Sequence, residues 1–206
     1  MNQNPIIMKN LKNTNFIDKV VRALRKAAVE LEEFHVKASL GKTEALDKYE
    51  QIKKKFNLFI HDSNTKVKEG KEKIEDLNTK FDELRVQLAL GKAETFESFK
   101  EQKKQLLLTL HELEVKIKTN ETLNRMYAFM LIEIEQFKVQ LEVLEQKMEK
   151  GKGETKTSFE KGKQKFNKFV DEIKEKYTKK DETKWDHFQS EISEAFVHLK
   201  QAFTNA

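Results

Sequence analysis

Apolar residues recur every three or four positions along almost the whole chain. One such series runs from Ile17 to Phe59, a second from Ile74 to Leu106 and a third from Leu123 to Phe169. A shorter series runs from Trp185 to Phe203. Steps of three and four place side chains on one face of an α-helix, as they do in coiled coils. The pattern predicts an all-α fold with coiled-coil-like seams.

Clusters of polar, turn-forming residues indicate where these helices end. The clusters lie at residues 62–65, 119–120 and 179–181. Such residues cap helices and favour turns over helix interiors. They predict helices over residues 13–61, 65–118, 121–178 and 182–203.

Short turns make consecutive helices antiparallel neighbours. We therefore predict an elongated antiparallel bundle of three long helices, each of about 50 residues, with a shorter C-terminal helix. Residues 1–12 are expected to form a flexible N-terminal arm, and residues 13–206 a single helical-bundle domain.

An internal repeat marks the middle of each predicted long helix. The motif Gly-Lys-x-Glu occurs three times, and an aromatic residue follows each glycine by eight positions. The glycines are Gly41, Gly91 and Gly151, and the aromatic residues are Tyr49, Phe99 and Phe159. Agreement beyond the four-residue motif indicates a true structural repeat.

A glycine within a helical pattern has two interpretations. It costs about 1 kcal/mol relative to alanine and can instead mark a loop, which would give seven short helices. The apolar series keeps its phase across all three glycines, which favours continuous or gently bent helices. Each glycine would then lie on the seam, where it lets neighbouring helices approach closely. We predict that the three glycines and the three aromatic residues form a waist shared by the long helices.

Composition supports long helices and excludes several other classes. The only proline is Pro5, so no later residue breaks a helix in that way. The absence of cysteine excludes disulfides, thiol nucleophiles and cysteine-ligated zinc. The first residues lack the pattern of a signal peptide, and the longest apolar stretch, 126–134, is interrupted by Glu133 and too short to span a bilayer. A cytoplasmic protein is expected.

Positive charge is concentrated in one segment. The chain carries 40 basic and 35 acidic residues, a net charge of +5, and residues 150–184 contain twelve lysines against seven acidic residues. Lysines near an anionic membrane contribute about 1 kcal/mol each, so this segment is a candidate for binding an anionic surface. The alternative is that its lysines only solvate the outside of the bundle. The candidate residues are Lys150, Lys152, Lys156, Lys161, Lys163, Lys165 and Lys168.

Patterns that would carry catalysis or metal binding are incomplete. The sequence Gly41-Lys42-Thr43 matches the end of a phosphate-binding loop, but Val36 stands where the motif requires glycine. Glu32 and His35 have the spacing of a di-iron ligand pair, but no second pair accompanies them. We therefore predict no catalytic, cofactor-binding or metal-binding residue, no cofactor and no small-molecule substrate.

Recognition through a surface remains as the expected mode of action. A thin helical rod buries little apolar surface, and residues such as Phe96, Leu107 and Phe188 would remain exposed and favour association. We expect a homo-oligomer, a dimer or larger, that acts as a non-enzymatic structural or scaffold protein. Nucleic-acid binding has less support because the aromatic residues lie on the seams, away from bases.

The predicted layout also resembles that of BAR-type modules. The similarity lies in a chain of about 200 residues with three long antiparallel helices, basic residues and expected dimerisation. This resemblance implies an alternative function, a peripheral membrane-binding module that places its lysine-rich helix faces on anionic lipid.

Overall fold

Seven helices form the part of the chain that the structure, a computed structural model, describes. Residues 5–37, 42–69, 75–118, 123–150, 156–178 and 185–204 are described, and no strand occurs among them. The helices are α1 (Pro5–Lys37), α2 (Lys42–Glu69), α3 (Glu75–Leu88), α4 (Phe96–Lys118), α5 (Asn124–Lys150), α6 (Lys156–Thr178) and α7 (Trp185–Thr204). The predicted all-α class is confirmed.

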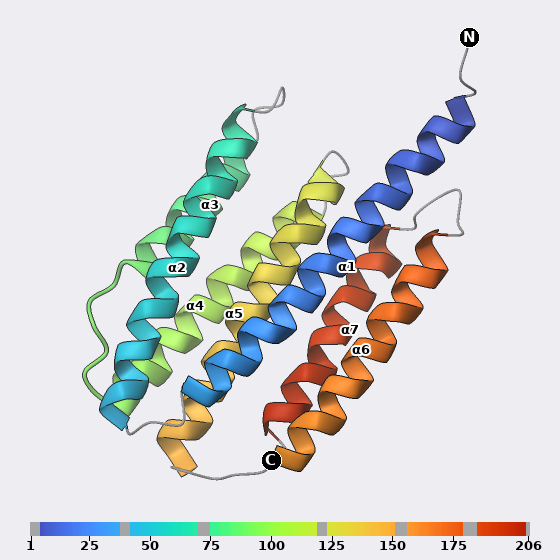
Figure 1. The fold of residues 1–206 in the computed structure, drawn as a ribbon. Helices are drawn as coiled ribbons and strands as arrows, with labels where there is room; N and C mark the ends of the chain where they lie inside the picture. The colour runs from blue at the N-terminus through green and yellow to red at the C-terminus, as the bar shows by residue number, and fades with distance from the viewer. Residues whose placement is uncertain are drawn as a thin grey trace.

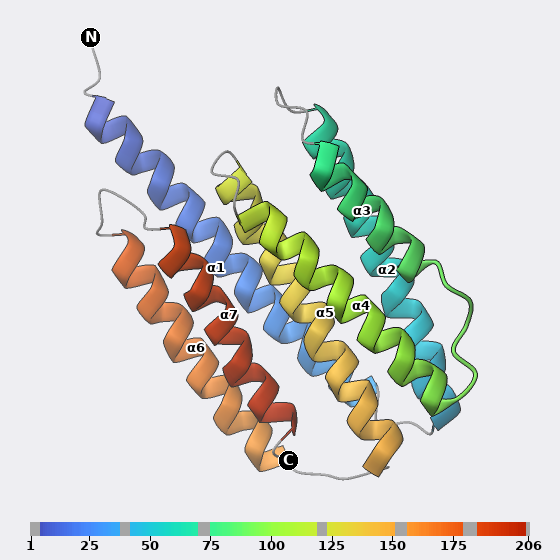
Figure 2. The same ribbon diagram turned by 180° about the vertical axis from the view of Figure 1, so that it is seen from behind.

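The helices form two lobes that share α5. Consecutive helices run in opposite directions, and their axes are roughly aligned (Figure 1). On one side α5 packs against α2 and α4, which α3 joins into the first lobe; on the other side α5 packs against α1 and α7, which α6 joins into the second lobe. The view from behind shows the same order, with α5 between the lobes (Figure 2). Each lobe together with α5 is a four-helix bundle.

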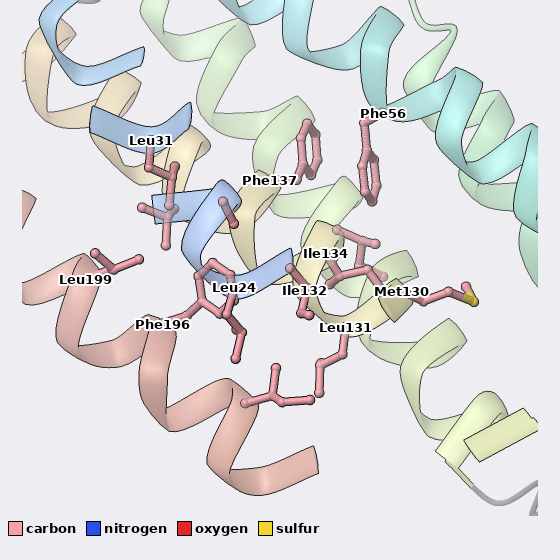
Figure 3. Close-up of a cluster of buried hydrophobic side chains, with 14 of the residues drawn as sticks. Leu24, Leu31, Phe56, Met130, Leu131, Ile132, Ile134, Phe137, Phe196 and Leu199 are labelled. Carbon is pink, nitrogen blue, oxygen red and sulfur yellow. The ribbon is translucent and has the colours of Figure 1, made fainter. Parts of the chain in front are cut away.

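The sequence of α5 suits its central position because apolar residues cover most of its circumference. Its buried apolar residues include Tyr127, Ala128, Met130, Leu131, Ile132, Ile134, Phe137, Val139, Leu141, Val143, Leu144 and Met148. A helix that is apolar on all sides is stable only when it is enclosed. Figure 3 shows Leu24 and Leu31 of α1 with Phe196 and Leu199 of α7 on one side of α5, while Phe56 of α2 lies on the other.

The prediction of three long continuous helices is wrong. The longest helix, α1, has 33 residues, and α3 has only 14. Residues 89–95, which include Gly91, lie outside any helix and separate α3 from α4. Gly41 and Gly151 fall outside the described residues, but the helices on either side of each run in opposite directions (Figure 1). The opposite directions of these flanking helices let the chain enclose α5, which an open rod would leave partly exposed.

The start of α4 shows why the helix breaks before it. Ser98 N donates a hydrogen bond to Thr95 Oγ1 over 3.1 Å, and Thr95 N donates to Ser98 Oγ over 3.0 Å. These reciprocal bonds satisfy backbone donors that a helix start leaves without partners, as in a capping box. Thr95 is therefore an N-cap, so the sequence already contained a helix start four residues after Gly91.

Three further expectations are corrected. The predicted turn at residues 62–65 lies inside α2, where Asn64 is buried and donates a hydrogen bond to Asp82 over 3.2 Å. A polar residue remains in a helix when its side chain finds a partner there. Phe188, expected to be exposed, is fully buried. Helix α1 begins at Pro5, so residues 5–12, expected in a flexible arm, are helical.

We predict that the Gly91→Ala variant keeps its stability. A Cβ atom at Gly91 would meet no heavy atom within 4 Å, and the backbone is not in the left-handed region. Alanine at such a position stabilises by about 0.4–1 kcal/mol through the unfolded state. Urea unfolding should therefore give an unchanged or slightly raised midpoint. A loss above about 1 kcal/mol would instead support a tightly packed waist at this residue.

Candidate functional site

Tyr49, Phe99 and Gly91 are the three residues of the predicted waist whose surroundings the structure describes. The rings of Tyr49 and Phe99 are fully buried and pack edge to face, 4.9 Å between centroids. Gly91 is exposed in the connection between α3 and α4, so it does not lie on a helix seam. Gly41, Gly151 and the side chain of Phe159 lie outside the described residues. The structure therefore brings two of the six residues together and places a third at the surface.

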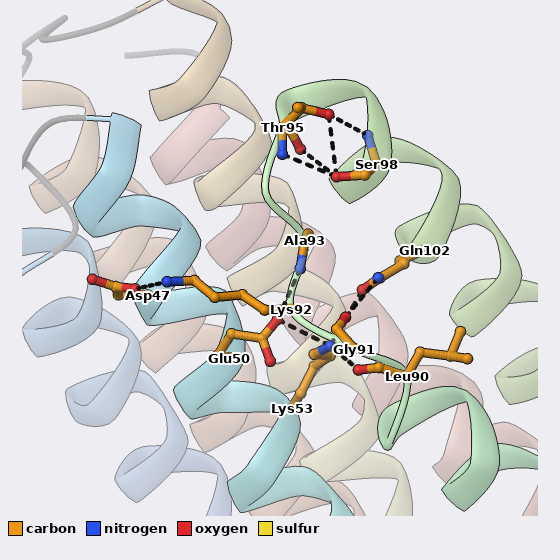
Figure 4. A network of polar contacts seen from close by, with 10 residues as sticks. All are labelled: Asp47, Glu50, Lys53, Leu90, Gly91, Lys92, Ala93, Thr95, Ser98 and Gln102. Carbon is orange, nitrogen blue, oxygen red and sulfur yellow. Dashed lines mark hydrogen bonds and ion pairs between the residues drawn. The ribbon is translucent and has the colours of Figure 1, made fainter.

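A buried lysine fixes the α3–α4 connection to α2. The side chain of Lys53 is 1% exposed, and its Nζ donates hydrogen bonds to the Leu90 carbonyl oxygen over 3.0 Å and to Gln102 Oε1 over 3.2 Å (Figure 4). Glu50 completes its surroundings as an ion-pair partner at 3.0 Å. A buried charge needs such partners because desolvation alone would cost several kcal/mol.

Three further contacts hold this connection in place, two to α2 and one to α4. Lys92 forms an ion pair with Asp47 at 2.7 Å, and the buried Ala93 donates a backbone hydrogen bond to Glu50 over 3.4 Å. Gln102 of α4 donates to the Gly91 carbonyl oxygen over 2.9 Å. The connection therefore takes the place of a helix along this part of α2 (Figure 4).

The position of Lys53 is repeated, which the sequence analysis missed. Lysine follows each repeat glycine by twelve residues, at Lys53, Lys103 and Lys163. Lys103, which is buried, binds Glu142 at 3.2 Å and also Glu145, both on α5. Extending the alignment past the aromatic residue would have shown this signal in the sequence.

The third lysine links two helices of the second lobe. Lys163 of α6 forms an ion pair with Glu32 of α1 at 2.5 Å. Lys53 therefore binds the segment of the second repeat (α3–α4), Lys103 that of the third (α5–α6) and Lys163 that of the first (α1–α2). Each repeat contributes one lysine that links it to another repeat.

The lysine-rich segment is exposed only in part. Lys161, Lys165 and Lys168 are exposed at spacings of four and three residues along α6, so they share one face. Lys163 forms an ion pair with Glu32. Lys152 and the side chains of Lys150 and Lys156 lie outside the described residues.

The described residues contain no group of three or more histidine, cysteine, aspartate or glutamate residues placed to hold a metal ion. None of the helices, within this part of the chain, is both long and apolar enough to cross a membrane. Glu32, one member of the Glu32/His35 pair, is bound to Lys163.

Several charged residues of α5 are partly enclosed between the lobes. Burial raises the pKa of Glu133 and of Glu135 above the ordinary carboxyl value. Burial alone would lower the pKa of Lys138, but Glu135 and Glu114 together raise it. Lys138 lies 2.9 Å from Glu114 and 3.3 Å from Glu135. Glu133 has no such partner among the described residues.

The surface has a groove on each side of α5. The α1–α2 groove lies between those two helices and contains adjoining hollows of about 260 and 370 Å³. The α4–α7 groove lies on the opposite side, with hollows of about 160 Å³ between α4, α5 and α7 and about 350 Å³ against α4. Both grooves lie where the two bundles meet at their shared helix, because residues of α5 and of one helix from each lobe line them: α1 and α2 for the first groove, α4 and α7 for the second.

Comparison of the chain with protein-family models, with curated proteins and with solved structures finds no match in any of the three. The assignment of function therefore depends on the grooves and charged surfaces themselves.

We predict that Lys53→Met destabilises the protein more than Lys163→Met. Removing the ammonium group of Lys53 leaves buried acceptors without a donor, which costs about 1–3 kcal/mol. Lys163 has the same place in its repeat, but its side chain is 31% exposed and its ion pair contributes at most about 1 kcal/mol. Urea unfolding of the two variants measures the difference. Equal losses would mean that burial of Lys53 has no energetic consequence.

We also predict opposite effects for Glu133→Gln and Glu30→Gln. The raised pKa of Glu133 means that its ionised form is disfavoured in the folded state, so glutamine should stabilise the protein at pH 7. Burial alone would raise the pKa of Glu30, but hydrogen bonds from Gln136 and Lys55 lower it, so glutamine there should destabilise.

The contributions of Glu133 and Glu30 to stability change with pH in opposite directions. The folded state binds the proton of Glu133 more tightly, so its stability penalty appears as pH rises above about 4.5 and is absent below. The contribution of Glu30 has the opposite course and is lost as pH falls. The charges that act on Glu133 are Lys55, Lys26 and Glu30. Urea unfolding at pH 7 and pH 4 measures both variants; a destabilised Glu133→Gln protein at pH 7 contradicts the prediction.

Proposed function

We propose that the protein is a non-enzymatic structural or scaffold protein that acts by self-association through its α4–α7 face. The observation that carries this proposal is an apolar stripe on α4. Leu108 and Val115 are 52% and 48% exposed, although both are large apolar residues. They lie seven residues apart, which places them on the same face of the helix.

The neighbouring residues extend this stripe across the face. Leu107 and Leu108 line the larger hollow against α4, and Val115 lines the hollow that reaches α7. On α7, Val197 is 49% exposed and lies one turn after Ser193, which lines the same hollow as Val115. Exposed apolar residues gathered on one face can mark a contact site.

Charges on the same face favour a second copy of the chain as the partner. Lys100 and Lys104 are exposed on α4, while Glu145, which also binds Lys103, lies across the larger hollow on α5. A two-fold axis places each surface patch against its own copy, so basic and acidic groups in one patch can pair across the interface.

Membrane binding is the alternative, and one observation favours it. Lys161, Lys165 and Lys168 form an exposed line on α6, which could lie on anionic lipid. Acidic Glu172 lies 3.9 Å from Lys168, which reduces the positive charge of this face. The apolar stripe on α4 is therefore the stronger basis for a function.

We predict that the double variant Leu108→Lys, Val115→Lys impairs self-association. Burying half-exposed apolar side chains contributes about 1 kcal/mol each, and both copies lose two of them. The dissociation constant of the assembly should rise at least about tenfold. Sedimentation velocity over a range of protein concentrations measures this shift.

A matched control is Val29→Lys, Val36→Lys. These valines are also seven residues apart and exposed, at 50% and 68%, but they lie on α1. The control should associate as the unmodified protein does. A monomer at all concentrations for the unmodified chain would contradict self-association, and equal effects of both double variants would contradict the α4–α7 face.

A further inference from the structure

The α1–α2 groove has the form of a binding site. Its two hollows share Ile52, Lys55 and Gln140 as lining residues, so they form one continuous depression with α5 as its floor. Combined, they fall within the usual range of ligand pockets, about 300–1,000 Å³. The flanking helices α1 and α2 run in opposite directions on either side of it (Figure 1).

The apolar part of the groove is aromatic. Phe56 of α2 stacks on Phe137 of α5 with ring centroids 4.2 Å apart, and Phe59 lies 5.7 Å from Phe56. Phe59 is only partly buried and lines the hollow with the other two rings. Figure 3 shows Phe56 and Phe137 face to face at this edge of the core. Phe56 and Phe137 are buried and each has one face against the other, so Phe59 offers the more accessible aromatic surface to an alkyl stem.

Glu133 supplies a carboxyl group beside these rings. It lines the same hollow from α5, is partly buried and forms no hydrogen bond or ion pair with another described residue. The nearby Lys55 is already bound to Glu30 at 2.9 Å, and Gln136 also donates to Glu30 over 2.9 Å. Lys55 and Lys26 act on Glu133 only through their charge, so the groove keeps one partly enclosed carboxyl that no cationic group pairs with directly.

The balance of charge in the groove is negative. Lys48 and Lys55 are its basic residues, and its acidic residues are Glu30, Glu33, Asp62 and Glu133. This balance opposes an anionic ligand. The described residues also hold no cluster suited to a metal ion.

We propose that the α1–α2 groove binds an organic cation, an alkylammonium or guanidinium group on an apolar stem. Glu133 receives the charge, and Phe59, backed by the buried Phe56 and Phe137, contacts the stem. The cation supplies the direct ion-pair partner that Glu133 lacks in the protein alone. This site lies on the side of α5 opposite the proposed self-association face and is independent of it.

Titration with n-hexylammonium chloride tests the proposal, with sodium hexanoate as the anion of matched stem. Isothermal titration calorimetry and amide chemical shifts of α2 and α5 residues should show saturable binding of the ammonium ion and none of hexanoate. Glu133→Gln should weaken binding at least tenfold. Asp62→Asn removes the same charge from the rim of the groove and should change affinity less than threefold.

Two results would overturn the proposal: equal binding of both probes, or unchanged affinity in Glu133→Gln when its unfolding curve shows it to be folded. Repeating the titration on Leu108→Lys, Val115→Lys separates binding from self-association, because that variant retains the whole groove. A second arm uses a helical peptide with one lysine on its apolar face. Binding at least tenfold tighter than that of hexylammonium identifies a partner protein's side chain as the source of the cation, and equal or weaker binding identifies a free amine.

Discussion

Enclosure of α5 by four neighbouring helices is the constraint on which the rest of the structure depends. Ile132 and Phe137 lie on different sides of this helix, and each needs a neighbouring helix to remove it from water. Burying one such side chain contributes about 1.5–3 kcal/mol, so leaving one side open would lose several of these contributions. Helices α1, α2, α4 and α7 supply the four neighbours. A three-helix rod has no helix with four neighbours, and this is why the helices on either side of each repeat glycine run in opposite directions.

The lysine twelve residues after each repeat glycine does not bind the same kind of acceptor in every repeat. Lys103 and Lys163 both bind the glutamate that precedes the repeat glycine of another hairpin by nine residues, Glu142 and Glu32. The corresponding residue for Lys53 is Asp82, but Asp82 instead accepts a hydrogen bond from Asn64. Helix α3 ends at Leu88, which exposes backbone carbonyl groups nearby, and Lys53 binds that of Leu90. The linkage between repeats is therefore retained although its acceptor changes.

The sequence was sufficient for the fold class, for buried Tyr49 and Phe99, and for the ends of α4 and α6 at Lys118 and Thr178. It was insufficient at Gly91 for a geometric reason. From Leu88 to Phe99 is eleven residues, about three helical turns, so an apolar series keeps its phase whether the intervening chain is helix or loop. The cap formed by Thr95 and Ser98 carried the missing information. The grooves could not be predicted because they depend on which helices pack against α5, and no local pattern specifies that.

Glu133 lies on α5 at a place where the packing of the helices leaves α5 uncovered. An enclosed helix should be apolar throughout, and the stretch 126–134 follows this rule except at Glu133. Two four-helix bundles that share a helix leave that helix uncovered along two lines, one at each groove. Glu133 lies on the line that faces the α1–α2 groove, where its carboxyl group reaches partial solvent. The exception in the sequence and the opening in the packing therefore coincide, and a charged residue is compatible with the centre of this fold only along such a line.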